Sequence, residues 1–431
     1  MAFGANYKRM DPACLLTRLA QGSKSMATEM ELYSSMAQFS CDMYSQVLAA
    51  QPMEAQNVFI SPLSVFVALL MTLVGAGGQT RLELRQSLHI PRQLEDNEVH
   101  NMFGSVLMNQ FMQSNDVNAS IANRLFVLQN ITVLGEFIDT LHKHYAAEAE
   151  MMNEYADMEA RRQRINQWVS ENTNSKIPEL LAEDVLSDNS VMALVNAVYF
   201  KGIWKHQFDK EMTQNGSFHR LDGNAVEVPM MVMTESFPYE DLPDMDAVAV
   251  KLPFGDSTRL GFDSRKPSKS KNKFSIKSVF RWELLVVLPN QKDGLHNLTM
   301  HFHANDTLEE LLAKPFFPMK LDIGLPRFKL SELTPLDMKT LLQKMGLESL
   351  FSQSADLSNL SSDGNIFVSE FVHKAIIEVN EEGAEAAAGS GVVSSTSLPI
   401  EFLVDHPFVM ALVYNSTVPV FIGHVTDPEL L

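Results

Sequence analysis

Apolar positions in the first part of the chain recur mostly at helical spacing. Residues 31–50 carry them three or four positions apart, which predicts a helix. A second apolar segment, residues 57–78, contains Ser61-Pro62, a typical helix start, and ends in a glycine-rich run. Residues 160–174 predict a further, amphipathic helix.

From residue 190 onward, strand patterns dominate. Residues 190–208 are rich in β-branched and aromatic side chains with little polar alternation, the pattern of a strand buried on both faces. Residues 328–347 predict a strand and then a helix, and residues 401–427 predict strands with a hairpin at 415–417. Helices come early and strands late, without strict βαβ alternation or a fixed repeat. The predicted fold class is therefore α+β.

The tract from Asn380 to Ile400 fits neither pattern. It consists largely of Ala, Gly and Ser and contains no Lys, Arg or aromatic residue, although strand-like apolar runs flank it. A flexible linker of small residues is one interpretation. That interpretation leaves the lead-in Glu381-Glu382-Gly383 and the flanking strands unexplained.

Composition supports a large core and excludes several classes of partner. The 431 residues are 45% hydrophobic. A net charge of -19 opposes nucleic-acid binding, which needs clustered Lys and Arg. No apolar run approaches the length of a membrane-spanning helix. The only two cysteines, Cys14 and Cys41, provide no disulfide framework. We expect neither a nucleic acid nor a membrane as a partner.

Signals for localisation disagree. Residues 1–25 lack the uninterrupted apolar stretch of a signal peptide. Sequons of the form Asn-x-Ser/Thr argue for the secretory pathway, where such asparagines are glycosylated. They begin at Asn118, Asn130, Asn215, Asn297, Asn305, Asn359 and Asn415. We expect an extracellular glycoprotein, with a cytoplasmic protein whose sequons are silent as the alternative.

One segment is unusually basic. Residues 259–281 carry eight Lys and Arg against one Asp, and they separate two runs that would otherwise make a tight hairpin. A solvated loop insertion is favoured over a polyanion-binding loop, because no aromatic or helical pattern organises the charges.

The residues that could carry catalysis form no recognisable constellation. His301 and His303 lack a Cys, Asp or Glu partner at metal-ligand spacing. Asp405-His406 comes without a nucleophile motif, and the glycine-rich run lacks the Lys-Ser/Thr of a phosphate loop. The sequence predicts no enzyme, no metal and no cofactor.

Four motifs, taken in order, resemble the serpin family, the serine protease inhibitors that trap proteases by changing fold. They are NVFISPLS at 57–64, INQWVSENTNSKI at 165–177, NAVYFKGIWKHQF at 196–208 and FLVDHPFVMAL at 402–412. The resemblance covers the chain from about residue 33. It implies one domain at 33–431, preceded by an extension at 1–32 that is expected to be poorly ordered. It also implies three β-sheets, about eight to nine helices and an exposed reactive-centre loop at 381–401.

The resemblance makes the small-residue tract the hinge of that loop. In the family, a target protease cuts the loop, which then inserts as an extra strand into the central sheet. Inserted side chains must alternate between closely packed faces, so small ones enter without clash. Even-numbered positions from Ala384 to Ser390 would face one side, and odd-numbered positions from Glu385 to Gly391 the other. The predicted hinge consists of Glu381, Glu382, Gly383, Ala384, Glu385, Ala386, Ala387, Ala388 and Gly389.

Two ways of counting place the cleaved bond one residue apart. Family spacing from the hinge puts the cut after Ser397, and spacing back from the C-terminal motif puts it after Thr396. The order Ser-Leu-Pro favours Thr396-Ser397 slightly. A different register would make Val393 or Leu398 the residue that the protease recognises.

The residues around this bond narrow the target class. No Lys or Arg follows Lys374, so a trypsin-like protease would leave its acidic specificity pocket unpaired. We expect an elastase-like, subtilisin-like or cysteine protease that accepts small residues.

The family pattern also implies roles for five residues away from the loop. Ser61, Ser64, Asn196 and His373 match a polar cluster where the central sheet opens, and their hydrogen bonds would gate insertion. Alternatively, these hydrogen bonds only satisfy polar groups that are buried in the fold. The four residues could serve both purposes. Trp204 matches a tryptophan beneath the top of the gap, with an ordinary core aromatic as the alternative.

The expected partner is a target endopeptidase, held covalently by a monomeric inhibitor. The glycosaminoglycan-binding helix of some serpins would fall at residues 81–92, where Arg81, Arg85 and Arg92 stand beside Glu83. We expect only weak glycosaminoglycan binding and no strong heparin activation. A non-inhibitory carrier, chaperone or storage serpin is the alternative, and the intact small-residue hinge favours inhibition.

Overall fold

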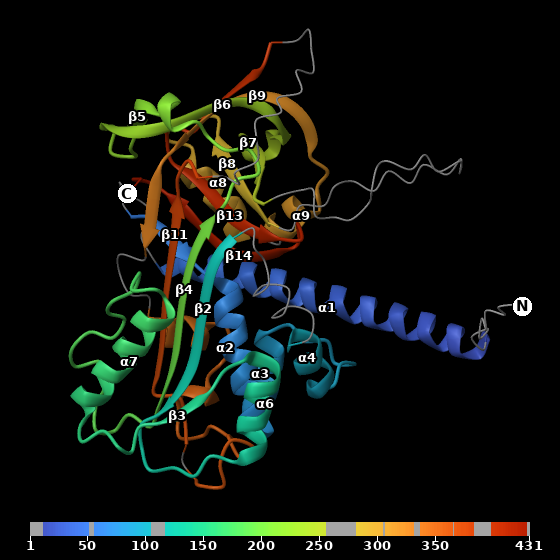
Figure 1. Ribbon diagram of the computed structural model, residues 1–431, viewed down its shortest axis with the longest axis vertical. Coiled ribbons are helices and arrows are strands. Elements are labelled where there is room, and N and C mark those ends of the chain that lie inside the picture. Colours follow the sequence, from blue (N-terminus) through green and yellow to red (C-terminus); the bar gives the residue numbers. More distant parts are fainter. Residues whose placement is uncertain are drawn as a thin grey trace, which may run out of the picture.

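Two β-sheets and the helices around them make up the described part of the chain (Figure 1). A computed structural model describes residues 12–50, 56–104, 117–255, 282–304, 307–331, 337–364, 366–382 and 398–428. The predicted hinge from Gly383 onward, the bond candidates Thr396 and Ser397, and the basic segment 259–281 lie outside the described residues.

The five-stranded sheet contains the long buried strand that the sequence predicts within residues 190–208. Its order is β10 (Phe328–Ser331), β11 (Glu370–Val379), β4 (Met192–Gly202), β2 (Val117–Val127) and β3 (Ala149–Met151). β11 runs parallel to β4, and β2 runs antiparallel to it. Figure 1 shows these three strands side by side.

The nine-stranded sheet joins the other strands through the long strand β6. Its order is β1 (Val58–Ile60), β14 (Val418–Val425), β13 (Phe408–Tyr414), β8 (Trp282–Pro289), β7 (Ala247–Pro253), β6 (Ala225–Leu242), β9 (Phe317–Pro326) and β12 (Ile400–Leu403), with β5 (Gln214–His219) paired to β6. β6 pairs with β5 at its start, with β9 along its middle and with β7 at its end. Hydrogen bonds along β6 join these strands into one continuous sheet, so the described residues form two sheets where the family resemblance implied three. The α+β class is confirmed.

Nine α-helices lie among the described residues. They are α1 (Pro12–Ala50), α2 (Pro62–Gly75), α3 (Gly78–Ser87), α4 (Asp96–Met102), α6 (Gly135–Tyr145), α7 (Met158–Asn172), α8 (Leu295–Ala304), α9 (Thr307–Ala313) and α10 (Met338–Lys344). α2 is buried along almost its whole length and ends in the predicted glycine-rich run. Ser61 caps it by accepting a hydrogen bond from Ser64 N, and Pro62 is its first residue, as the sequence predicts.

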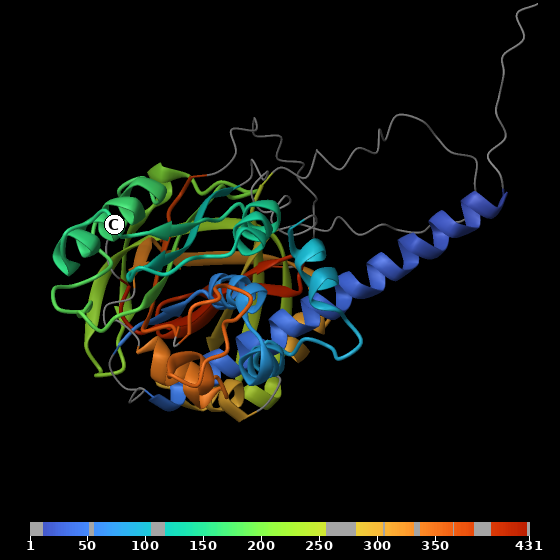
Figure 2. The ribbon, with the colours of Figure 1, turned by 90° about the horizontal axis from the view of Figure 1, so that it is seen from below.

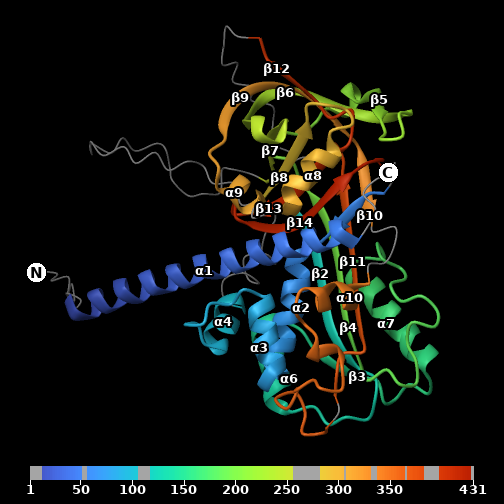
Figure 3. The same cartoon turned by 180° about the vertical axis from the view of Figure 1, so that it is seen from behind.

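α1 begins at Pro12, well before the start predicted at residue 31. From Leu32 onward its apolar side chains pack into the main core, and its earlier turns extend away from the rest of the molecule (Figures 2 and 3). Residues 12–30 are thus helical in continuity with the domain. The boundary of the domain at residue 33 stays a prediction.

α7 covers one face of the five-stranded sheet. Its side chains Ile165, Trp168 and Val169 pack in one cluster with alternate residues of β4, among them Val195 and Tyr199. The other face of the sheet joins the main core, which contains α2. β4 is therefore buried on both faces, as its continuous apolar sequence predicts.

Two predicted hairpins are confirmed. Asn415 and Ser416 have φ values of 52° and 56°, the left-handed backbone that suits the tight connection between β13 and β14. The runs on either side of the basic segment pair as β7 and β8.

Candidate functional site

The seam between β4 and β11 is closed along its length. Nine residue pairs, from Glu370–Ala193 to Glu378–Lys201, align the two parallel strands. After Glu382, the next described residue is Leu398, which leads into β12 in the other sheet. The small-residue tract therefore connects the end of β11 at the seam with a strand of the nine-stranded sheet. Leu398 is 91% exposed.

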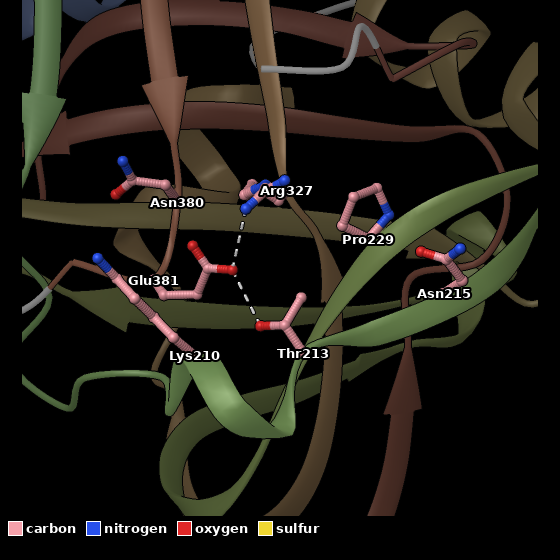
Figure 4. Close-up of a pocket in the computed structure, with 7 residues that line it drawn as sticks. All are labelled: Lys210, Thr213, Asn215, Pro229, Arg327, Asn380 and Glu381. Atoms are coloured by element: carbon pink, nitrogen blue, oxygen red, sulfur yellow. Dashed lines mark hydrogen bonds and ion pairs between the residues drawn. The ribbon is translucent and has the colours of Figure 1, made fainter.

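Glu381, the first residue of the predicted hinge, is anchored beyond the end of β11 (Figure 4). It is only 4% exposed. Thr213 Oγ1 donates to Glu381 Oε1 at 2.9 Å, and Arg327 Nη1 lies 3.5 Å from the same oxygen. These residues line an open pocket of about 550 Å³, which Lys210 also lines. Residues near the starts of β5 and β10 thus fix the root of the hinge.

Trp204 also binds residues 380–382, the stretch of chain that contains Glu381. Its indole Nε1 donates to Asn380 O at 2.6 Å, and its backbone N donates to Glu382 O at 3.1 Å. Its ring stacks on Phe254 with 4.2 Å between centroids. Lys201 Nζ also lies 2.6 Å from Glu382 Oε2. Trp204 therefore packs in the core and also binds the hinge root.

The four residues of the predicted polar cluster come together across the seam. Asn196 on β4 and His373 on β11 are directly aligned, and Asn196 Oδ1 is hydrogen-bonded to His373 Nδ1. Ser64 Oγ donates to Asn196 Oδ1 at 2.8 Å. Ser61 N donates to His373 Nε2 at 3.2 Å. All four residues are buried, so the start of α2 is bound to both strands of the seam.

Asn123 is a fifth member that the sequence analysis missed. It lies on β2 opposite Asn196, and its side-chain oxygen accepts a hydrogen bond from Asn196 Nδ2. The sequence of β2 contains several polar residues, so Asn123 gave no distinct local signal. Arg327 and Thr213 at the hinge root were missed as well, because their role depends on strand pairing far along the chain.

Burial keeps His373 neutral. Its ring is enclosed between α2 and the two strands of the seam, and loss of water lowers the pKa of His373 to about 3. Burial likewise lowers the pKa of His100 and of His424 to about 4. In an unfolded chain all three would take up a proton near pH 6.5.

Acid is therefore expected to destabilise the native protein from about pH 6.5 downward, because only the unfolded state takes up these protons. Between pH 7 and pH 5, each of the three histidines should lower the free energy of unfolding by about 2 kcal/mol. Urea unfolding at the two pH values measures this loss. His373→Gln should reduce the loss of unfolding free energy between pH 7 and pH 5 by about 2 kcal/mol. Replacing the exposed His296 by Gln should leave that loss unchanged. If His373→Gln loses as much stability as the wild-type protein, His373 does not contribute to the acid sensitivity.

The sequons occupy different environments. Four of their asparagines are exposed: Asn130, Asn215, Asn297 and Asn359. The Asn359 amide donates to Ala76 O at 2.9 Å, and the half-buried Asn415 donates to the Tyr33 hydroxyl at 3.5 Å. Two lie outside the described side chains: Asn118 and Asn305. Asn130, Asn215 and Asn297 are the ones that could carry a glycan without losing a described contact to the backbone or to Tyr33.

Two of the three arginines at residues 81–92 are neutralised locally. Arg81 Nε lies 2.5 Å from Asp96 Oδ2, and Arg85 binds the other oxygen of the same carboxylate.

His406 follows Asp405 directly in the sequence. Its ring binds the Asp405 carboxylate at 2.7 Å and Pro289 O at 2.8 Å, so it links the start of β13 to the end of β8.

Among the described helices, none has the length and apolar character needed to cross a bilayer.

Fold and site together define a class: an α+β protein in which a tract of small residues follows the strand β11 at the seam of the five-stranded sheet. Residues 34–428 match the family described as Serpin (serine protease inhibitor), and the chain belongs to that family. Three similar curated proteins span nearly the whole chain. Iris of Ixodes ricinus is 31% identical over 93% of this chain and all of its own length. Serpin B3 of Homo sapiens is 32% identical over 86% of this chain and 94% of its own. The leukocyte elastase inhibitor of Sus scrofa is 31% identical over 92% and 100%.

Solved structures agree with this assignment. AtSerpin1 of Arabidopsis, in its native stressed conformation, matches with a TM-score of 0.77 and 26% identity over 92% of this chain and 98% of its own. Uncleaved ovalbumin matches with a TM-score of 0.77 and 25% identity over 92% and 100%. The serpin resemblance drawn from four motifs is confirmed.

Proposed function

We propose that this protein is an inhibitory serpin that traps a serine or cysteine endopeptidase as a covalent complex. The observation that carries the proposal is where the small-residue tract starts. It leaves β11 at its seam with β4, beside a hinge root held by Glu381 and Trp204. A chain that turns back there would run antiparallel to both strands, with every backbone group able to pair. Relatives named as leukocyte elastase inhibitors support an inhibitory role.

The proposed mechanism is an interrupted proteolysis. The protease Ser Oγ or Cys Sγ attacks the carbonyl carbon of Thr396, or of Ser397 in the alternative register. The next residue leaves as a free amine, and an ester or thioester remains. The cut loop then inserts between β4 and β11 and carries the protease with it before water can release the acyl group. Small side chains from Ala384 onward make that insertion fast.

The target is a protease that accepts small or aliphatic residues. No Lys or Arg follows Lys374 in the chain, so the acidic group in the specificity pocket of a trypsin-like protease would be buried without a partner.

The pairing of Arg81 and Arg85 with Asp96 supports weak glycosaminoglycan binding. We further propose a monomer with no nucleic-acid or membrane partner. The exposed sequons favour an extracellular glycoprotein, with a cytoplasmic address as the alternative.

Mixing the protein with elastase, trypsin and a papain-like protease tests the function directly. We expect a band that resists denaturation near the summed masses with elastase or papain, and none with trypsin. Mass spectrometry of that band locates the acyl bond at Thr396 or Ser397. Clean cleavage without the band would reject inhibition and favour a carrier, chaperone or storage serpin.

A further inference from the structure

A charged contact bridges the seam on the face covered by α7. Lys176, which follows α7, donates from Nζ to Glu378 Oε1 on β11 at 2.8 Å. The same ammonium lies 5.3 Å from the ring centroid of Tyr199 on β4. Because Ile376 pairs with Tyr199, Glu378 lies diagonally across the seam from that ring. One cation therefore touches both strands that would have to separate.

The ion pair between Lys176 and Glu378 is partly buried, so water screens it only in part. The Glu378 side chain is only 9% exposed, whereas Lys176 is 39% exposed. Burial, together with hydrogen bonding and charge from Glu378, raises the pKa of the Tyr199 phenol. The three groups thus form one connected unit across the seam, in which Glu378 binds both Lys176 and Tyr199.

The turn after α7 holds Lys176 in place. Asn174 and Ser175 both adopt left-handed backbone, with φ values of 51° and 59°. Thr173 Oγ1 accepts from Ile177 N at 3.2 Å, so the turn is closed around Lys176. Ile177 itself is fully buried. A side chain that projects from an ordered turn loses less conformational entropy when it binds than one that projects from a mobile loop.

An inserted strand cannot coexist with this bridge. Neighbouring strands lie about 4.8 Å apart, so a strand between β4 and β11 doubles their separation. Lys176 could then stay near Glu378 or near Tyr199, but not both, and Tyr199 could no longer bind Glu378. The bridge must break before or during insertion.

We propose that Lys176, Glu378 and Tyr199 form a latch that sets the rate at which the seam opens. Lys176 acts as a positioning residue, because it touches neither the protease nor the cleaved bond. This inference rests on the proposed inhibitory function and adds to it a named control on the speed of insertion. Removing the latch is expected to speed opening about tenfold, the rate effect of losing one charge-assisted hydrogen bond.

The test uses the full-length protein and a synthetic peptide with the sequence of residues 383–395 as a free strand. The rate at which the peptide anneals to the uncleaved protein is followed by native gel. Lys176→Met removes the charge and keeps the chain length, and Glu378→Gln keeps the shape. Lys176→Arg keeps the cation. Glu171→Gln is the matched control, since Glu171 is exposed at the end of α7 and binds Gln167 on the same helix.

Annealing about tenfold faster in Lys176→Met and in Glu378→Gln supports the latch, provided that Lys176→Arg and Glu171→Gln stay near the wild-type rate. The double variant should be no faster than either single one, because both remove the same contact. The substitutions should lower the thermal stability of the loop-cleaved forms less than that of the intact forms, whereas a purely structural role would lower both equally. Unchanged rates, or equal acceleration in Glu171→Gln, would overturn the latch.

Failure of the latch and failure of the function give different results. If the wild-type protein forms the covalent complex and anneals the peptide, but the variants match it, only the latch is rejected. If the wild-type protein does neither, inhibition is rejected and the latch falls with it. Should Lys176→Met fail to fold, Glu378→Gln compared with Glu171→Gln decides the question.

Discussion

Cutting the loop at Thr396 or Ser397 is expected to raise the midpoint of thermal unfolding by about 10–25 °C. The cut frees a strand that can pair with β4 on one side and β11 on the other. An inserted strand of about a dozen residues adds on the order of ten to twenty backbone hydrogen bonds, each with a net contribution of about 1 kcal/mol. A domain of this size has an unfolding entropy of about 0.8 kcal/mol per kelvin, which converts that gain into the stated shift.

Calorimetry of the intact and the cleaved protein measures the change. Ala386→Arg provides the control, because it places a long charged side chain in the strand that must enter a packed sheet. This variant should still be cleaved, gain little thermal stability and release the protease instead of trapping it. A cleaved wild-type protein that unfolds at the temperature of the intact one would contradict insertion.

Reversing the charge of Glu381 is expected to destabilise the native protein by about 3–5 kcal/mol, the usual cost of breaking a buried charge pair. Glu381→Lys would lose the hydrogen bond from Thr213 and the ion pair with Arg327. It would also place a new cation beside Arg327, in a pocket that Lys210 already lines. The end of β11 would then come loose at the seam, and the exposed strand edges would promote association between molecules.

Urea unfolding and native gels measure both effects. Glu382→Lys is a matched control, because the carboxylate of the neighbouring Glu382 is 47% exposed and, among the described residues, forms its ion pair with Lys201. A half-exposed pair contributes about 1 kcal/mol or less. Equal destabilisation by the two substitutions would mean that burial of Glu381 has no special part in holding the hinge.

Several elements could be predicted locally. The Ser61-Pro62 start of α2 follows from a capping hydroxyl and a proline that needs no hydrogen-bond partner at that position. β4 follows from a run of apolar side chains too continuous for a sheet with a wet face. α1 was placed too short, because its first turns leave the body of the molecule and so carry none of the apolar periodicity that buried turns show.

The candidate site could be predicted only in part. The polar cluster and Trp204 were identified through motifs shared with a family. Asn123, Arg327 and Thr213 were not, since each acts through a residue more than fifty positions away. The latch around Lys176 was likewise invisible, because it depends on which residues of β4 and β11 are opposite one another.

The sequence by itself therefore determined the fold class, the buried strand, the capped helix and the unusual small-residue tract, since each depends on side chains within a few residues of one another. Only the tertiary structure decided that this tract starts at a closed seam between two parallel strands, and that Glu381, His373 and Lys176 each bind across or beside that seam. The physical reason is that hydrogen-bond register and the contacts of a buried charge are set by segments that meet only in the folded chain.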